Sequence, residues 1–247
     1  MALSHSPSIV IDGLVVHVDA GNIKSYPGSG TTLKDLRNGY DLSTAGTLNT
    51  SNDASAGTIY DHNGSGLIQT ATFTPISSLT WSIIWWIRTT GTPPSNYRGI
   101  VRLLDTNAGT GSNYPGYYWQ TDQRTTTSQY IHEYQKAWNG TDNQAAWSAS
   151  NVVDTADWTS QAWFCCGVSH NKPAGGNGVF KSYKNGSLKT TRTNSLANSG
   201  YGDINKLLFN TSSGNTIYMG VVSLYDRVLT DLEFEQNFNA FKGRYGL

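Results

Sequence analysis

The residues best suited to binding chemistry lie in one polar loop, residues 105–115, and at the start of the segment that follows it. Amide and carboxylate groups can hydrogen-bond the hydroxyls of a ligand, and aromatic rings offer apolar faces beside them. We therefore expect a glycan- or partner-binding site built from Asp105, Asn107, Asn113, Tyr114 and Tyr117. A loop that is merely stabilised by Asn and Asp turns remains the alternative.

The same loop is the best candidate for a metal site. Calcium requires several carboxylate and carbonyl oxygens, and an EF-hand loop also needs a glycine at its sixth position and a final glutamate. The loop offers one carboxylate, Asp105, and lacks both of those other features. We expect no metal and no cofactor, with Ca²⁺ at this loop as the alternative.

Catalytic constellations are absent from the sequence. Glycoside hydrolysis needs two carboxylates set on either side of the bond that is cleaved. The glutamates are Glu133, Glu233 and Glu235, and Glu133 has no aspartate two residues away. There is also no Gly-x-Ser-x-Gly elbow and no phosphate-binding glycine loop, and Lys136 stands where a zinc-binding His-Glu-x-x-His motif would need its second histidine. We expect no catalytic residues and no enzyme activity; a glycosidase with an unrecognised site is the alternative.

Composition limits the class of partner. The 247 residues carry 17 basic and 17 acidic side chains, and charged residues make up only 14%. We see no Lys/Arg cluster that would indicate nucleic-acid binding, no apolar run long enough for membrane insertion, and no secretory signal. We expect a short arm at residues 1–8 and a single domain at residues 9–247.

One stretch, Thr80 to Arg88, organises the predicted fold. Alternate side chains give one wholly apolar face, Trp81, Ile83, Trp85 and Ile87, and a second face that is apolar in its middle, at Ile84 and Trp86. This period of two predicts a β-strand that is covered on both sides, as in a layered β structure. A sugar-stacking platform made by the tryptophans is the alternative.

Further strands are predicted on the same grounds. They cover residues 14–19, 67–73, 99–104, 117–120, 130–134, 163–169, 179–184, 187–191, 205–209 and 217–225. His17 and His132 lie inside two of them and are expected to be structural or surface residues and not catalytic ones. Residues 20–46 and 49–57 are expected to be turns and loops. Asn185-Gly186 predicts a tight hairpin because type I′ turns need positive φ at both central residues. Cys165 and Cys166 are expected to be buried thiols, since neighbours on a strand point to opposite faces.

A helix is predicted near the C-terminus. Thr230 and Glu233 form a capping box, Phe234, Phe238 and Phe241 make one apolar stripe for packing on the sheet edge, and Gly243 ends the helix. Residues 242–247 are either a docking tail or a frayed end.

Three segments together carry a family resemblance. They are residues 163–186, an aromatic strand followed by a loop and a strand that ends in Asn-Gly; residues 221–231, a strand that runs into Tyr-Asp-Arg-Val-Leu-Thr-Asp; and residues 11–22. This pattern resembles the concanavalin A-like lectin/glucanase superfamily, in its laminin-G-like jelly-roll branch. Residues 24–32 and 237–247 look like versions found in tailed-phage structural proteins.

The resemblance implies an all-β fold, a two-sheet antiparallel jelly-roll sandwich with one short C-terminal helix. It also implies a non-catalytic structural or accessory protein on the capsid or tail surface of a phage virion, assembled in the host cytoplasm. The expected partners are other virion proteins and cell-surface glycans, in a homo-oligomer. The alternatives are a carbohydrate-binding lectin module and, behind it, a glycoside hydrolase.

Overall fold

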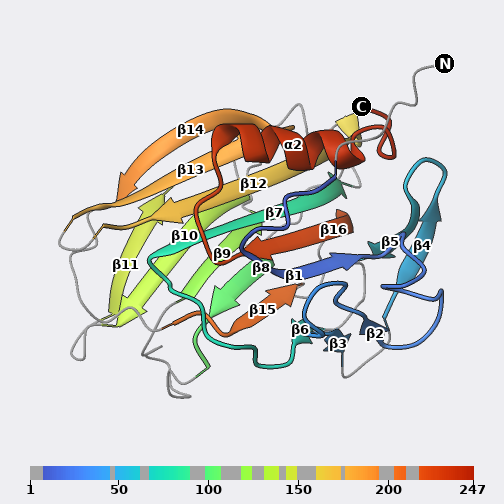
Figure 1. Ribbon diagram of the computed structural model, residues 1–247, viewed down its shortest axis with the longest axis horizontal. Coiled ribbons are helices and arrows are strands. Elements are labelled where there is room, and N and C mark those ends of the chain that lie inside the picture. The colour runs from blue at the N-terminus through green and yellow to red at the C-terminus, as the bar shows by residue number, and fades with distance from the viewer. Residues whose placement is uncertain are drawn as a thin grey trace.

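The computed structural model describes residues 8–44, 48–61, 67–89, 98–106, 118–123, 131–138, 143–148, 160–173, 176–194, 203–209 and 217–247. Two eight-stranded sheets stack face to face, and helix α2 (Asp231–Phe241) lies across the outer face of the first one (Figure 1). Every strand pairing among the described residues is antiparallel, and register shifts interrupt four of these pairings. The predicted all-β, two-sheet antiparallel sandwich is confirmed.

The first sheet is built around the tryptophan-rich strand. Its order is β14 (Ser187–Asn194), β13 (Gly178–Lys184), β12 (Trp163–Asn171), β7 (Thr80–Thr89), β16 (Ile217–Tyr225), β5 (Gly57–Asp61) and β4 (Thr50–Asp53), and β1 (Leu14–Asp19) also pairs with β16. Strands β5 and β1 share one edge of β16: β5 pairs with Tyr218 and Met219, and β1 pairs with residues 221–225.

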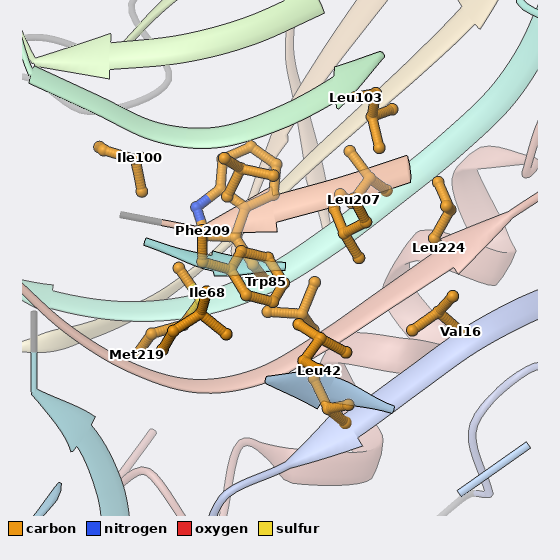
Figure 2. Close-up of a cluster of buried hydrophobic side chains, with 14 of the residues drawn as sticks. Val16, Leu42, Ile68, Trp85, Ile100, Leu103, Leu207, Phe209, Met219 and Leu224 are labelled. Atoms are coloured by element: carbon orange, nitrogen blue, oxygen red, sulfur yellow. The ribbon is translucent and has the colours of Figure 1, made fainter. Parts of the chain in front are cut away.

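The second sheet covers the other side of the core. Its order is β11 (Asn143–Ser148), β10 (Ile131–Trp138), β9 (Tyr118–Gln123), β8 (Arg98–Leu104), β15 (Lys206–Phe209), β6 (Ile68–Thr70), β3 (Leu42–Thr44) and β2 (Thr32–Leu33). The core between the sheets is contributed by both of them, as the labelled side chains of Figure 2 show.

Strand β7 is buried on both faces, as its sequence predicts. Trp81, Ile83, Trp85 and Ile87 point into the core between the sheets, and Ile84 and Trp86 belong to a second apolar cluster on the outer face. Trp81 meets Trp119 of the second sheet edge-on, with ring centroids 4.8 Å apart. The three tryptophans of β7 are fully buried, so they form no sugar-stacking platform.

Helix α2 has the predicted capping box and apolar stripe. The Thr230 hydroxyl accepts a hydrogen bond from the Glu233 backbone N–H, and the Glu233 carboxylate accepts one from the Thr230 backbone N–H. Phe234 stacks on Tyr183 at 3.7 Å, and Phe238 stacks on Trp86 at 5.6 Å. The stripe therefore packs on the outer face of the first sheet, over the apolar middle of β7. The prediction that it packs on the sheet edge was wrong.

The residues after the helix are clamped to the sheet. Tyr245 is buried, with its ring stacked on Trp86 at a centroid distance of 4.2 Å, and Gly220 leaves the room that the Tyr245 hydroxyl occupies. Arg244 pairs with Asp19. Residues 242–247 are thus part of the fold, and neither a free docking tail nor a frayed end.

The hairpin and the cysteines agree with the sequence. Asn185 and Gly186 have φ angles of 50° and 78° and join β13 to β14. Cys165 and Cys166 are free, buried thiols on opposite faces of β12. Burial raises the pKa of the Cys165 thiol.

Several short polar strands lie where the sequence predicts turns and loops, so those predictions were wrong. Residues 49–57 were expected to be a loop, yet they contain β4 and begin β5, and residues 20–46 contain β2 and β3. Strand β11 falls in a stretch with no clear pattern. Strand β4 reads Thr-Ser-Asn-Asp and lies at a sheet edge, where no apolar alternation is required.

Candidate functional site

The predicted binding loop is described only at its start. Asp105 follows β8 and is half-buried, and the next residue, Thr106, donates from its backbone N–H and its hydroxyl to Asn205 Oδ1, at 2.9 and 3.1 Å. Asn107, Asn113, Tyr114 and Tyr117 lie outside the described residues. The glycan- or partner-binding role of this loop, with Ca²⁺ as its alternative, stays a prediction.

A second candidate lies on the outer face of the first sheet, at the end where β7 finishes. Here Trp163 of β12 pairs with Arg88 of β7, and Arg88 pairs with Tyr218 of β16. Strands β12, β7 and β16 are neighbours in the first sheet (Figure 1). Directly opposed residues of neighbouring strands place their side chains on one face, so the three form a row across these strands. We call Trp163, Arg88 and Tyr218, with the nearby Asp53, the Arg88 row.

The guanidinium of Arg88 is held between two aromatic rings. Its central carbon lies 4.7 Å from the Tyr218 ring centroid and 5.5 Å from the Trp163 ring centroid. Its Nη1 donates to Asp53 Oδ2 at 2.5 Å. The Arg88 side chain is 29% exposed and the Asp53 side chain 5%, so the arginine rather than the carboxylate faces solvent. Cation–π contacts and an ion pair together fix this guanidinium in one orientation.

Asp53 is held in place by hydrogen bonds and orients Arg88. Its Oδ1 accepts hydrogen bonds from the Ser55 backbone N–H (2.9 Å), the Ser55 hydroxyl (2.7 Å) and the Ala56 backbone N–H (2.8 Å). Burial favours the neutral acid, but the hydrogen bonds from Ser55 and Ala56 outweigh it and lower the pKa of Asp53 to about 2. Asp53 therefore stays ionised near neutral pH, where it can orient Arg88 but cannot act as a general acid.

The row offers recognition rather than reaction chemistry. Tyr218 is half-buried: the Arg88 guanidinium lies over its ring, and the residue packs against the outer apolar cluster. A half-buried aromatic ring beside a fixed, partly exposed hydrogen-bond donor is suited to a ligand that is both polar and apolar, such as a sugar ring. No second acceptor for Arg88 occurs in the part of the chain that the structure describes.

Other carboxylates of the described chain have structural partners. Arg227 donates to Glu233 through both terminal nitrogens, at 2.5 Å from Nη2 and 3.0 Å from Nη1. Hydrogen bonding from Arg227 outweighs burial and lowers the pKa of Glu233 to about 2. Asp35 accepts four backbone N–H bonds, from His17, Arg37, Asn38 and Tyr40. These groups hold loops and a helix start in place.

Neither His17 nor a group of metal-binding side chains forms a reactive site in the described residues. His17 Nδ1 lies 2.9 Å from Ser223 Oγ, but both side chains are buried, and the His17 ring stacks on Phe241. Burial lowers the pKa of His17. The side chain of His132 lies outside the described residues. No group of three or more His, Cys, Asp or Glu side chains is placed to hold a metal ion within the described ranges.

The Arg88 row was missed by sequence reasoning. Arg88 was recognised only as the polar end of an apolar strand, and Trp163 and Tyr218 only as members of two other predicted strands. One feature of the sequence could have indicated it: Arg88 stands near the end of a strand that is otherwise rich in tryptophan and isoleucine. The register that brings the three together depends on pairing between strands far apart in the chain.

Among the residues that the structure describes, no helix is long and apolar enough to cross a membrane.

Comparison with known proteins identifies the architecture. No protein-family model and no curated protein sequence matches the chain. The receptor-binding domain of botulinum neurotoxin type G superposes with a TM-score of 0.60 at 14% identity, over 92% of this chain and 51% of that one. The binding domain of botulinum neurotoxin DC, solved in complex with rat synaptotagmin II, gives a TM-score of 0.60 at 15% identity, over 92% and 51%.

A third solved structure carries the same fold. It belongs to botulinum neurotoxin type C, whose cell entry is dependent upon interaction with two ganglioside molecules. It gives a TM-score of 0.59 at 16% identity, over 92% of this chain and 51% of that one. The chain spans about half the length of these structures. At such identities the likeness is one of fold, and it places the chain among β-sandwich domains.

Proposed function

We propose that this chain is a non-catalytic recognition module that binds a glycan through the Arg88 row. The observation that carries the proposal is the half-buried Tyr218 ring beside the guanidinium of Arg88, which Asp53 and Trp163 hold in place. A site whose groups are already fixed loses little conformational entropy when a ligand binds. The neurotoxin domains of the same fold are named for receptor binding or for ganglioside interaction, which supports this class of function.

The absence of catalysis is part of the proposal. Asp53 and Glu233 are ionised and hydrogen-bonded to partners, so neither can act as the protonated acid that a glycosidase needs. The solved structures of the same fold are binding domains by name. If a panel of polysaccharides released reducing sugar on incubation with the protein, this part of the proposal would be wrong.

The narrower proposal places the module on the surface of a tailed-phage virion, on the capsid or the tail, after assembly in the host cytoplasm. It rests on the resemblance of residues 24–32 and 237–247 to segments of phage structural proteins. Other virion proteins would then be its partners, in a homo-oligomer, and the glycan would belong to a host cell. Mass spectrometry of purified particles tests this, and absence of the chain from them would count against it.

The glycan proposal is tested on an array of neutral and carboxylated oligosaccharides. We expect specific binding by the wild type and a loss of about tenfold or more in affinity for Tyr218→Ala, as for an aromatic residue at the centre of an interface. Tyr40→Ala is the matched control, because Tyr40 is also partly buried but packs on Phe73, away from the row.

Two further variants locate the site. Tyr114→Ala and Tyr117→Ala alter the loop that the sequence predicts to bind. If they abolish binding while Tyr218→Ala does not, the glycan site lies in that loop and the Arg88 row is structural. If the wild-type protein binds no glycan on the array, the glycan function itself is wrong.

A further inference from the structure

Arg88 offers a ligand one edge of its guanidinium. Its Nη1 donates to Asp53 Oδ2 at 2.5 Å, and the Tyr218 and Trp163 rings lie over the planar group. The remaining donors, Nε–H and Nη2–H, have no acceptor among the described residues. Neither belongs to the buried polar atoms without a partner, so both reach solvent in a side chain that is 29% exposed. These two N–H groups lie along the same edge, where a ligand can accept two parallel hydrogen bonds.

Two kinds of ligand group fit a pair of parallel donors. One is an anion, such as a carboxylate or a phosphate, which a guanidinium commonly binds through two oxygens. The other is a vicinal diol, the two hydroxyl groups on neighbouring carbons of a sugar ring, in which each oxygen accepts one hydrogen bond. The two differ in charge, so the charges already present at Arg88 decide between them.

The charge of Arg88 is balanced by Asp53. The Asp53 side chain is 5% exposed, and its Oδ1 accepts three hydrogen bonds from Ser55 and Ala56, so the carboxylate is fixed beside Arg88. The same hydrogen bonds keep it ionised, with a pKa of about 2. An anion that approached Arg88 would be repelled by this neighbouring carboxylate, which offsets its attraction to the guanidinium. A neutral diol meets no such repulsion.

Tyr218 adds apolar surface next to the open edge. It is half-buried and lies directly beside the guanidinium, so the C–H groups of a sugar ring can contact it while the hydroxyls bond Arg88. Trp163 is only 5% exposed, and its role is to hold Arg88 from the other neighbouring strand.

We propose that the Arg88 row binds neutral sugars through a vicinal diol and selects against sugars that carry a carboxylate, a specificity that rests on the proposed glycan function. Nε–H and Nη2–H of Arg88 each donate to one hydroxyl oxygen of the diol. Asp53 is the positioning residue: it orients the guanidinium and repels anionic ligands without touching the sugar.

The test uses the full chain and 1,4-linked tetrasaccharides of glucose, mannose and galactose, each joined to a fluorescent label as a glycoside. Each is prepared unmodified, oxidised to the uronate at C6, and as the 3-deoxy form, which has no vicinal hydroxyl pair. We expect the wild type to bind at least one unmodified sugar about tenfold or more tightly than its uronate and its 3-deoxy form, because a hydrogen bond to a charged group contributes about that much to affinity.

Two variants separate the roles of the ion pair. Asp53→Asn removes the repelling charge and keeps the shape, so the preference for the unmodified sugar over its uronate should fall about tenfold. Arg88→Lys keeps the positive charge but removes the planar pair of donors, so affinity for the unmodified sugar should fall by about the same factor. Asp41→Asn is the matched control, because it removes a carboxylate from another ion pair, with Lys34 at 2.6 Å, and should change neither quantity.

The contrary outcomes separate the two proposals. If no sugar binds, or if Tyr218→Ala leaves binding unchanged, the proposed glycan function is wrong, and diol binding at the row is wrong with it. If Tyr218→Ala abolishes binding but the wild type binds the uronate as tightly as the unmodified sugar, the glycan function stands and the neutral specificity is wrong. Equal binding of the 3-deoxy form would exclude the diol. An unchanged preference in Asp53→Asn would show that Asp53 does not select the ligand, and the wild-type preference decides the specificity even if that variant does not fold.

Discussion

Arg244 and Asp19 form a two-point ion pair that joins the last residues of the chain to the end of its first strand. Arg244 Nη1 lies 2.7 Å from Asp19 Oδ2, and Nη2 lies 2.6 Å from Oδ1. The Asp19 side chain is 5% exposed, so Arg244 supplies the counter-charge of a buried carboxylate. The pair fixes the segment that carries Tyr245 onto Trp86, and it explains why residues 242–247 are ordered against the sheet.

Replacing Arg244 with alanine should therefore destabilise the protein by about 3 kcal/mol, because a buried carboxylate loses its counter-charge. The free energy of unfolding in urea measures the loss. Lys242→Ala is the control: Lys242 is exposed and follows the same helix, so its removal should cost no more than about 0.5 kcal/mol. Equal losses for the two variants would show that the Asp19 pair contributes nothing specific.

The hairpin glycine Gly186 gives a second prediction. Its φ of 78° disfavours any side chain, and an added Cβ would lie 2.9 Å from Phe238 Cβ and 3.1 Å from Glu235 Cα on helix α2. We expect Gly186→Ala to cost about 1–2 kcal/mol for the left-handed backbone and a further ~1–3 kcal/mol for the collision with the helix.

Gly39→Ala separates these two costs. Gly39 has nearly the same φ, 79°, but an added Cβ there would meet nothing within 4 Å. Thermal unfolding should show the larger loss for Gly186→Ala. Indistinguishable losses would mean that α2 yields to the new methyl group and that the helix is not tightly packed on the hairpin.

The elements that were predicted from sequence are those whose signals are local. Strands β7 and β12 carry runs of apolar residues, α2 carries its own capping box, and Asn185-Gly186 specifies its turn within two residues. The elements that were missed, such as β4 at Thr50–Asp53, are polar and lie at edges, where burial imposes no pattern. For such a strand, pairing with its neighbour determines the structure.

The Arg88 row lay beyond sequence reasoning for a related reason. Arg88, Trp163 and Tyr218 come from three strands, and each pair is separated by more than 50 positions. Their alignment depends on the registers of β7 with β12 and β16, and a shift of one residue would turn Arg88 to the other face. The residue types indicated a binding surface only after the pairing was known.

Trp85 tests the central packing of the sandwich. It is fully buried between the sheets and lies 6.5 Å from Trp119, edge to face. We expect Trp85→Ala to cost about 3–5 kcal/mol through lost burial and a cavity. Trp85→Phe should cost clearly less, because it keeps a ring and because the indole N–H has no acceptor among the described residues. Molecules that still fold should keep their ligand specificity; a variant of wild-type stability that loses a ligand would place the binding site on this strand.

His170 makes the stability of the fold depend on pH. It is fully buried, its Nδ1 lies 3.0 Å from the Ser78 carbonyl oxygen, and it stacks on Phe180 at 4.3 Å. Burial, with a smaller effect from Lys172, outweighs the Ser78 hydrogen bond and lowers the pKa of His170 from 6.5 to about 4. Between these values the unfolded chain binds a proton that the folded chain excludes, so stability is full above pH 6.5 and falls as the pH drops towards 4. One such group lowers the free energy of unfolding by at most about 1.4 kcal/mol per pH unit.

Urea unfolding at several pH values tests this, and the free energy of unfolding should depend less steeply on pH for His170→Gln than for the wild type in this window. Because the substitution also removes the stacking on Phe180, the slope and not the stability at neutral pH is the diagnostic quantity, and an unchanged slope would show that His170 does not titrate with unfolding.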